Sequence, residues 1–142
     1  MACIFCEIVR GNIAAVKVME DEHSLAFLDN RPLFPGHILL VPKQHYETLM
    51  DLPAAGTGPL FANAQLLAAA VEDALDAAGS FVAINNRISQ SVPHLHVHVV
   101  PRRNKDGLKG FFWPRTPYNH EDEMEEVAVK LRSSLARAAA GK

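Results

Sequence analysis

The chain has 142 residues, of which 49% are hydrophobic and 21% are charged, and its formal net charge is −2. This length and apolar content predict one domain with a substantial core. The near-neutral charge favours neither nucleic acid nor an anionic membrane as a partner. There is no apolar run of about 18 residues to span a bilayer, and the N-terminus lacks the basic and apolar regions of a signal peptide.

The first part of the chain predicts strands joined in hairpins. Residues 14–20 alternate between apolar and polar side chains, and residues 24–28 follow them after a turn at 21–23. Two prolines and a glycine mark residues 31–36 as a loop, which leads into a third strand at 37–41. Residues 50–58 contain Pro53, Gly56 and Gly58 and are interpreted as a connection.

From Pro59 the apolar spacing changes to that of a helix, and Gly79 is predicted to end this helix. A strand at 80–84 follows, then a strand through residues 94–100. A final helix is predicted in the C-terminal tail, residues 102–142, with acidic residues at its start and basic residues near its end. The order predicts a single α+β domain over residues 1–142, with an antiparallel sheet, one long central helix and a C-terminal helix.

Three of the seven histidines lie at alternate positions of one apolar run, at 94, 96 and 98. Strand side chains alternate between two faces, so the three imidazoles form a row opposite Leu95, Val97 and Val99. A neutral imidazole can act at pH 7 as a nucleophile, a proton carrier or a metal ligand. Three ligands on one straight strand converge poorly on a single ion, but a metal-dependent hydrolase that uses this cluster stays open as an alternative.

This pattern, His-φ-His-φ-His-φ-φ with φ apolar, resembles that of the histidine triad (HIT) family. Three further segments support the resemblance: residues 3–8 with Cys3 and Cys6, residues 27–29, and residues 35–45. Together the segments span about residues 2–103. Position 98 carries His where the nucleotide-transferring branch of the family carries Gln, which indicates the hydrolase branch. The chain departs from the family at Ser89, where glycine is usual.

The resemblance implies a HIT-like fold and a nucleotide hydrolase in which His96 attacks the α-phosphate of a purine nucleoside phosphoramidate or dinucleoside polyphosphate. Water would then hydrolyse the nucleotidyl-histidine intermediate. The other implied catalytic residues are His98, His94, His37, Gln90 and Ser91. The implied substrate-binding residues are Asp29 for the ribose hydroxyls, Asn85 beside the phosphate, and Phe5, Ile8, Phe27 and Leu28 around the base. Alternatively, His37 is a packed strand histidine, Asp29 is a turn residue, and the four apolar residues belong to the hydrophobic core.

The pair Cys3-x-x-Cys6 indicates metal or redox chemistry, because two cysteines in an unexported protein are expected to stay reduced in the cytoplasm. The resemblance implies a structural zinc ion held in a closed Cys₂His₂ site by Cys3, Cys6, His45 and His94. A pair of plain thiols is the alternative.

The resemblance also implies an AMP-like purine nucleotide as substrate and a homodimer formed through the long helix and the sheet edge. No membrane or nucleic-acid partner is expected. Phe112, Trp113 and Arg115 follow the histidine strand and are predicted to meet the leaving group; a hydrophobic flap is the alternative. A nucleotide-binding or sensory protein with little turnover is a second function, and a pure interaction module is a third.

Overall fold

The computed structural model describes residues 2–108 and 115–141. The chain divides into two compact units, Met1–Asp106 and Gly107–Lys142. The first unit contains the sheet and all three triad histidines, and the second contains the C-terminal helix. A single domain over residues 1–142 stays a prediction.

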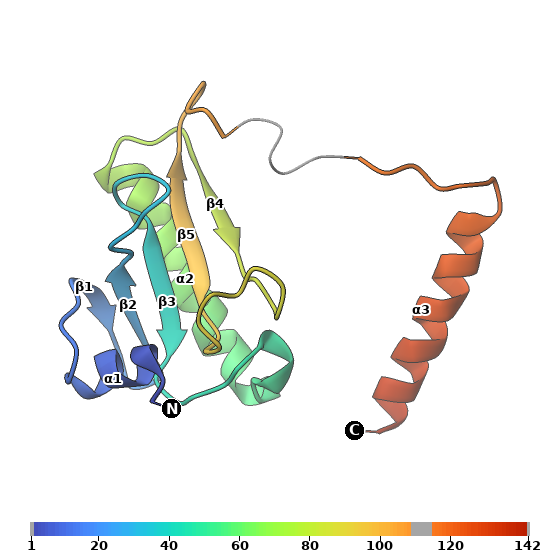
Figure 1. The fold of residues 1–142 in the computed structure, drawn as a ribbon, viewed down its shortest axis with the longest axis horizontal. Coiled ribbons are helices and arrows are strands. Elements are labelled where there is room, and N and C mark those ends of the chain that lie inside the picture. Colours follow the sequence, from blue (N-terminus) through green and yellow to red (C-terminus); the bar gives the residue numbers. More distant parts are fainter. Residues whose placement is uncertain (1, 109–114, 142) are drawn as a thin grey trace. The chain divides into compact units, whose positions relative to one another are not determined.

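The first unit is built on a five-stranded antiparallel sheet (Figure 1). Its strand order is β1-β2-β3-β5-β4, so β5 lies inside the sheet with a neighbour on each side. The strands are β1 Lys17–Glu20, β2 Ser24–Leu28, β3 Ile38–Pro42, β4 Gly79–Ala83 and β5 Val97–Arg102. This sheet, with its helices, confirms the predicted α+β fold.

The long helix α2, Ala54–Ala74, packs its apolar stripe against one face of the sheet. The interpretation of residues 50–58 as a connection is wrong beyond Pro53, because α2 begins at Ala54, and a short 3₁₀ helix, Leu49–Asp51, precedes it. Pro59 and two glycines lower helix propensity locally, but burial of the stripe outweighs that weak preference. Gly79 does not end the helix either, since α2 ends at Ala74 and Gly79 begins β4.

A short N-terminal helix that the sequence did not predict, α1 Ile4–Arg10, covers the opposite face of the sheet. Its Phe5 and Ile8 are buried against alternate residues of β2 and β3, namely Leu25, Phe27, Leu39 and Val41. The Cys3 sulfur accepts the amide hydrogen of Cys6 at 3.5 Å and so caps the start of this helix. Because both faces are covered, β2 and β3 are buried along almost their whole length.

The second unit contains α3, Glu123–Ala140, as the sequence predicted. Its first turn is acidic and Arg137 lies in its last turn, an arrangement that stabilises a helix dipole. None of its residues is buried, and Leu131 and Leu135 are 59% and 68% exposed. In the described residues no helix has the length and apolar character needed to cross a membrane.

Candidate functional site

The three triad histidines lie at and just before the start of β5. Leu95 and Val97 are fully buried on the α2 side of the sheet, as the alternation predicted. His94 and His96 are buried too, at 0% and 4% exposure. The Phe5 ring meets both imidazoles edge to face, with centroids 5.9 Å from His94 and 5.1 Å from His96. Phe5 of α1 therefore packs against the rings of His94 and His96.

Hydrogen bonding fixes the tautomer of His96. Its Nδ1 lies 2.7 Å from the backbone carbonyl oxygen of His94. Because a carbonyl oxygen only accepts, Nδ1 carries the ring proton, and Nε2 is left with its lone pair. The ring of His98 lies 4.9 Å away between centroids, tilted by 67°. A free imidazole lone pair therefore lies beside a second imidazole, which is the arrangement a nucleophile and its charge-stabilising neighbour require.

His37 lies behind this pair, on the segment that leads into β3. It is 3% exposed, and its Nε2 lies 2.9 Å from Nδ1 of His98. One proton therefore connects the two rings. Burial lowers the pKa of His37, and burial together with the nearby His96 and His37 lowers the pKa of His98 from 6.5 to about 4. His98 is thus neutral at pH 7, with one nitrogen that donates and one that accepts.

The lowered pKa of His98 predicts acid sensitivity of the fold. Between about pH 6.5 and pH 4 the unfolded chain takes up a proton at His98 that the folded chain does not, so the free energy of unfolding falls as the pH is lowered through this window. Urea unfolding at pH 7 and pH 5 measures the slope. His98→Gln removes this group, so its slope should be shallower by up to about one proton. Equal slopes in both proteins would contradict the assignment.

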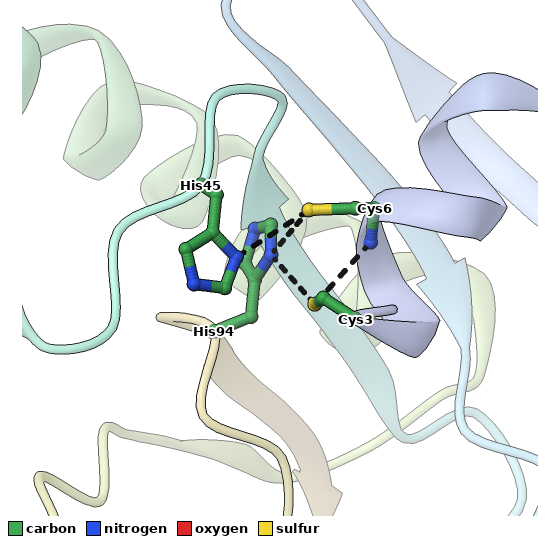
Figure 2. Close-up of side chains that lie close together, drawn as sticks. All are labelled: Cys3, Cys6, His45 and His94. Carbon is green, nitrogen blue, oxygen red and sulfur yellow. Dashed lines mark hydrogen bonds between the residues drawn. The ribbon is translucent and has the colours of Figure 1, made fainter. Parts of the chain in front are cut away.

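Four side chains that could hold a metal gather at the edge of the triad. Figure 2 shows Cys3 and Cys6 at the start of α1 turned toward His45 and His94. Their ligand atoms all lie within 4.8 Å of one another. His94 Nδ1 lies 3.3 Å from the Cys3 sulfur and 3.6 Å from the Cys6 sulfur, and His45 Nδ1 lies 3.4 Å from the Cys6 sulfur.

These distances and donors fit a tetrahedral zinc ion. Zinc bonds of about 2.3 Å to sulfur and 2.1 Å to nitrogen place neighbouring sulfur and nitrogen ligands about 3.6 Å apart. Nε2 of His94 lies 2.9 Å from the carbonyl oxygen of Pro42, so this nitrogen carries the proton and Nδ1 is free to bind a metal. The structure therefore brings the four predicted ligands together, and the sulfur–nitrogen distances fit a zinc ion.

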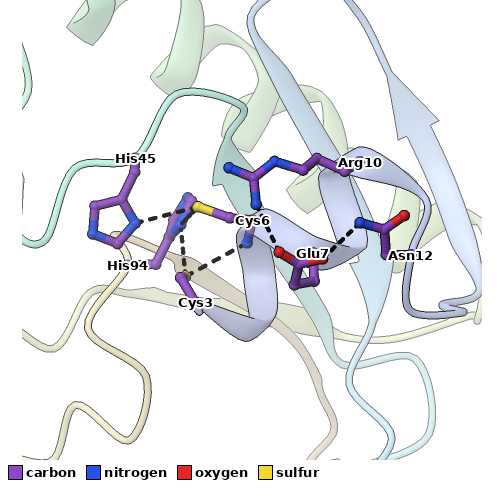
Figure 3. Close-up of polar contacts among 7 residues, drawn as sticks. All are labelled: Cys3, Cys6, Glu7, Arg10, Asn12, His45 and His94. Atoms are coloured by element: carbon purple, nitrogen blue, oxygen red, sulfur yellow. Dashed lines mark hydrogen bonds and ion pairs between the residues drawn. The ribbon is translucent and has the colours of Figure 1, made fainter. Parts of the chain in front are cut away.

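A second polar group lies at the C-terminal end of α1. Figure 3 shows the carboxylate of Glu7 between the side chains of Asn12 and Arg10, at 2.7 Å from each. These contacts, with Asn12 contributing most, lower the pKa of Glu7. The cysteine–histidine cluster therefore connects the start of α1 to distant segments, whereas the Glu7 contacts stabilise the helix locally at its C-terminal end.

The alternative of a metal-dependent hydrolase requires the ring nitrogens of His94, His96 and His98 to converge on one ion. In the part of the chain that the structure describes, the cluster of Cys3, Cys6, His45 and His94 is the one group close enough to share an ion. His96 and His98 direct their Nδ1 atoms to a carbonyl oxygen and to His37 respectively. This arrangement disfavours a metal-dependent hydrolase built on all three histidines.

The residues predicted to bind the ribose and the base have different surroundings. Asp29 holds a turn through Oδ1, which accepts the Arg31 amide hydrogen at 2.9 Å, while its Oδ2 lies 3.8 Å from Nδ1 of His37. Both interpretations of Asp29 therefore stay open. Ile8 and Phe27 pack with Phe5 in the core beneath α1, whereas Leu28 packs on the α2 side.

Gln90 in the loop before the triad forms two hydrogen bonds that the sequence did not predict. Gln90 accepts the Arg87 amide hydrogen at 2.8 Å and donates to the Glu47 carbonyl oxygen at 2.6 Å, so in this structure it holds loops together. Ser91 and Asn85 are exposed. Ser89, at the position where glycine is usual, has φ of +60°, so the serine adopts the left-handed conformation that glycine favours.

Comparison with known proteins places these features in one family. A family model described as the HIT domain matches residues 10–105. The adenosine 5'-monophosphoramidase hnt1 of Schizosaccharomyces pombe is 36% identical over 137 residues, covering 93% of this chain and 100% of that protein.

Solved structures agree with the family match. A HIT family member from Bacillus subtilis is 32% identical with a TM-score of 0.85, covering 94% of this chain and 96% of that one. A zinc-bound histidine triad family protein from Mycobacterium smegmatis is 39% identical with a TM-score of 0.72, covering 100% of this chain and 99% of that one. On its sequence, its fold and its histidine row, this chain belongs to the HIT family.

Proposed function

We propose that the chain hydrolyses purine nucleoside phosphoramidates at the α-phosphorus, through a covalent intermediate on His96. The observation that carries this proposal is the lone pair of His96 Nε2, which the hydrogen bond from Nδ1 to the His94 carbonyl leaves free beside His98. Support comes from the phosphoramidase relative, whose name describes the release of an amine from AMP. The family match supports a hydrolase in general terms.

The reaction divides into two displacements. In the first, His96 Nε2 forms a bond to phosphorus while the bond from phosphorus to the amine breaks, and the amine nitrogen takes up a proton from solvent water as it leaves. In the second, a water oxygen forms a bond to phosphorus and releases a proton to solvent, the bond to Nε2 breaks, and AMP is released. His98 donates a hydrogen bond to a non-bridging oxygen, where negative charge grows in each transition state. Asp29, beside His37, receives the ribose hydroxyls.

A dinucleoside polyphosphate is the alternative substrate, and the leaving group distinguishes the two classes. The tail residues predicted to select it, Phe112 and Trp113, lie outside the described residues, and Arg115 belongs to the second unit. Values of kcat/KM for AMP-amine, AMP-lysine and a dinucleoside polyphosphate test the proposal. Turnover of an amine-linked AMP supports it. Nucleotide binding with no turnover of any of the three would favour the sensory alternative.

We propose that the cysteine–histidine cluster binds structural zinc. All four positions are filled by protein ligands, so the site is closed and leaves no position for substrate. Cys3 and Cys6 at the start of α1, together with His45 and His94, would hold the ion, and its binding would supply folding energy. Two reduced zinc-ligand cysteines also fit the cytoplasmic location predicted from the sequence.

We infer a homodimer formed by α2 and β4. A shallow apolar depression on this face is lined by Phe61, Ala68 and Val82, and Phe61 and Val82 are each 43% exposed. β4 is an edge strand, and an exposed edge is stabilised by pairing or by being covered. A second copy of the same surface can cover the apolar depression and pair with the edge of β4.

The dimer is expected to show about twice the chain mass of 15.6 kDa by light scattering at micromolar concentration. Phe61→Asp places a charge in the apolar contact and should weaken association at least about 30-fold, corresponding to about 2 kcal/mol. Leu66→Asp is the matched control, because Leu66 is 62% exposed on α2 but does not line the depression. A monomeric parent protein, or equal effects of the two variants, would contradict this interface.

A further inference from the structure

We propose that the backbone amide of Leu33 selects the tautomer of His98, acting through His37. This inference rests on the proposed function, because it assigns how His98 comes to donate a hydrogen bond to the phosphate. Leu33 lies in the loop between β2 and β3 and is 50% exposed. Its amide contacts the site through His37 and acts as a positioning group.

The direction of each hydrogen bond follows from the first donor. The Leu33 amide nitrogen lies 3.1 Å from His37 Nδ1, and a backbone N–H only donates. Nδ1 of His37 therefore carries a lone pair, and Nε2 of the neutral ring carries the proton. That proton is donated over 2.9 Å to Nδ1 of His98. Nδ1 of His98 then accepts, so its Nε2 carries the proton that the proposed reaction uses.

The carboxylate of Asp29 favours the opposite placement of the ring protons on His37 and His98. Its Oδ2 lies 3.8 Å from the same His37 Nδ1, and a carboxylate there favours a proton on that nitrogen. With Nδ1 of His37 protonated, its Nε2 would accept from Nδ1 of His98. Nε2 of His98 would then present a lone pair to the phosphate oxygens in place of a hydrogen. The Leu33 amide thus stabilises the productive tautomer against the one that Asp29 favours.

The loop is built to hold this amide in place. The Asp29 amide donates to the His37 carbonyl oxygen at 2.9 Å, and the His37 amide donates to the Phe34 carbonyl oxygen at 3.0 Å. Gly36 adopts φ of +100°, and a Cβ at this position would collide with the Leu75 side chain. Two prolines restrict the remaining backbone between residues 31 and 36. A rigid loop of this kind can set the proton position of a buried ring.

The test removes the amide hydrogen and keeps the rest of the site. Leu33→Pro lacks the donor, whereas Leu33→Ala keeps it and serves as the matched control. Because proline can also disturb the loop, a second variant replaces Leu33 by its α-hydroxy acid, which exchanges the N–H for an ester oxygen and preserves the side chain. Nitrogen-15 NMR of labelled histidines reports which ring nitrogen carries the proton in each zinc-loaded protein.

The parent protein and Leu33→Ala are expected to hold His37 and His98 as Nε2–H tautomers. In the ester variant both rings should shift toward Nδ1–H, and kcat should fall about tenfold with KM unchanged, as for the loss of one hydrogen bond. Unchanged tautomers in a folded ester variant would overturn the inference. A shift in tautomer in a protein that turns over no nucleotide would leave this inference standing and contradict the proposed function.

Discussion

Replacement of His96 by alanine is expected to abolish turnover while AMP still binds. The alanine side chain cannot form the bond to phosphorus, so both displacements lose their nucleophile. The fall in kcat should exceed the factor of about 10⁴ that marks the upper end for loss of a general acid–base residue alone. Binding should persist, because the proposed ribose contact at Asp29 and the donor at His98 are unchanged. Steady-state kinetics and calorimetric titration with AMP measure the two effects separately.

His96 is 4% exposed, so alanine also leaves a cavity beside Phe5. His96→Asn controls for this effect: its amide N–H can occupy the position of Nδ1–H and donate to the His94 carbonyl, but it has no counterpart of Nε2. Both variants should be equally inactive, although His96→Asn should melt at a higher temperature than His96→Ala. Retention of near-parent kcat in either variant would remove His96 from the role of nucleophile.

Removal of zinc is expected to lower the melting temperature by about 12 °C. Zinc at about a thousand times its Kd stabilises the folded state by about 4 kcal/mol, and each kcal/mol shifts the melting temperature of a domain of this size by about 3 °C. His45→Ala is the most informative variant, because His45 is exposed and lies outside the triad. It should lose the metal by elemental analysis and reproduce the low melting temperature of the chelated parent.

The matched control for this variant is His23→Ala, since His23 is also exposed but is not among the four clustered residues. It should keep one zinc per chain and an unchanged response to chelator. A reduced, zinc-supplemented parent protein without metal would contradict the zinc site. Chelation that removes the metal without changing the melting temperature would contradict its structural role.

The parts of this molecule that were predictable are those with a side-chain signature. Alternation in residues 94–99 located the histidine row, and the apolar content of residues 24–28 and 37–41 predicted the strands that the structure has at 24–28 and 38–42. The four predicted metal ligands came from the family resemblance, and the structure brings them together. Spacing alone could not group His45 with Cys3, because their proximity depends on the packing of α1 against the sheet.

Local signals failed where tertiary contacts decide the conformation. Pro53, Gly56 and Gly58 indicated a connection, yet α2 begins at Ala54 and runs through both glycines, because residues further along bury its apolar stripe. The N-terminal helix has only seven residues, too short to be stable alone, and depends on Phe5 and Ile8 being buried. The role of the Leu33 amide could not be predicted from the sequence, because every residue except proline has a backbone N–H.

The central claim is that His96 is a covalent nucleophile, and the stereochemical course at phosphorus tests it most directly. A phosphoramidate with a chiral α-phosphorothioate is hydrolysed in ¹⁸O-water, and the configuration of the product is determined. Two in-line displacements, first by His96 and then by water, each invert phosphorus, so the account predicts overall retention. Overall inversion would show a single direct attack by water and would contradict the account.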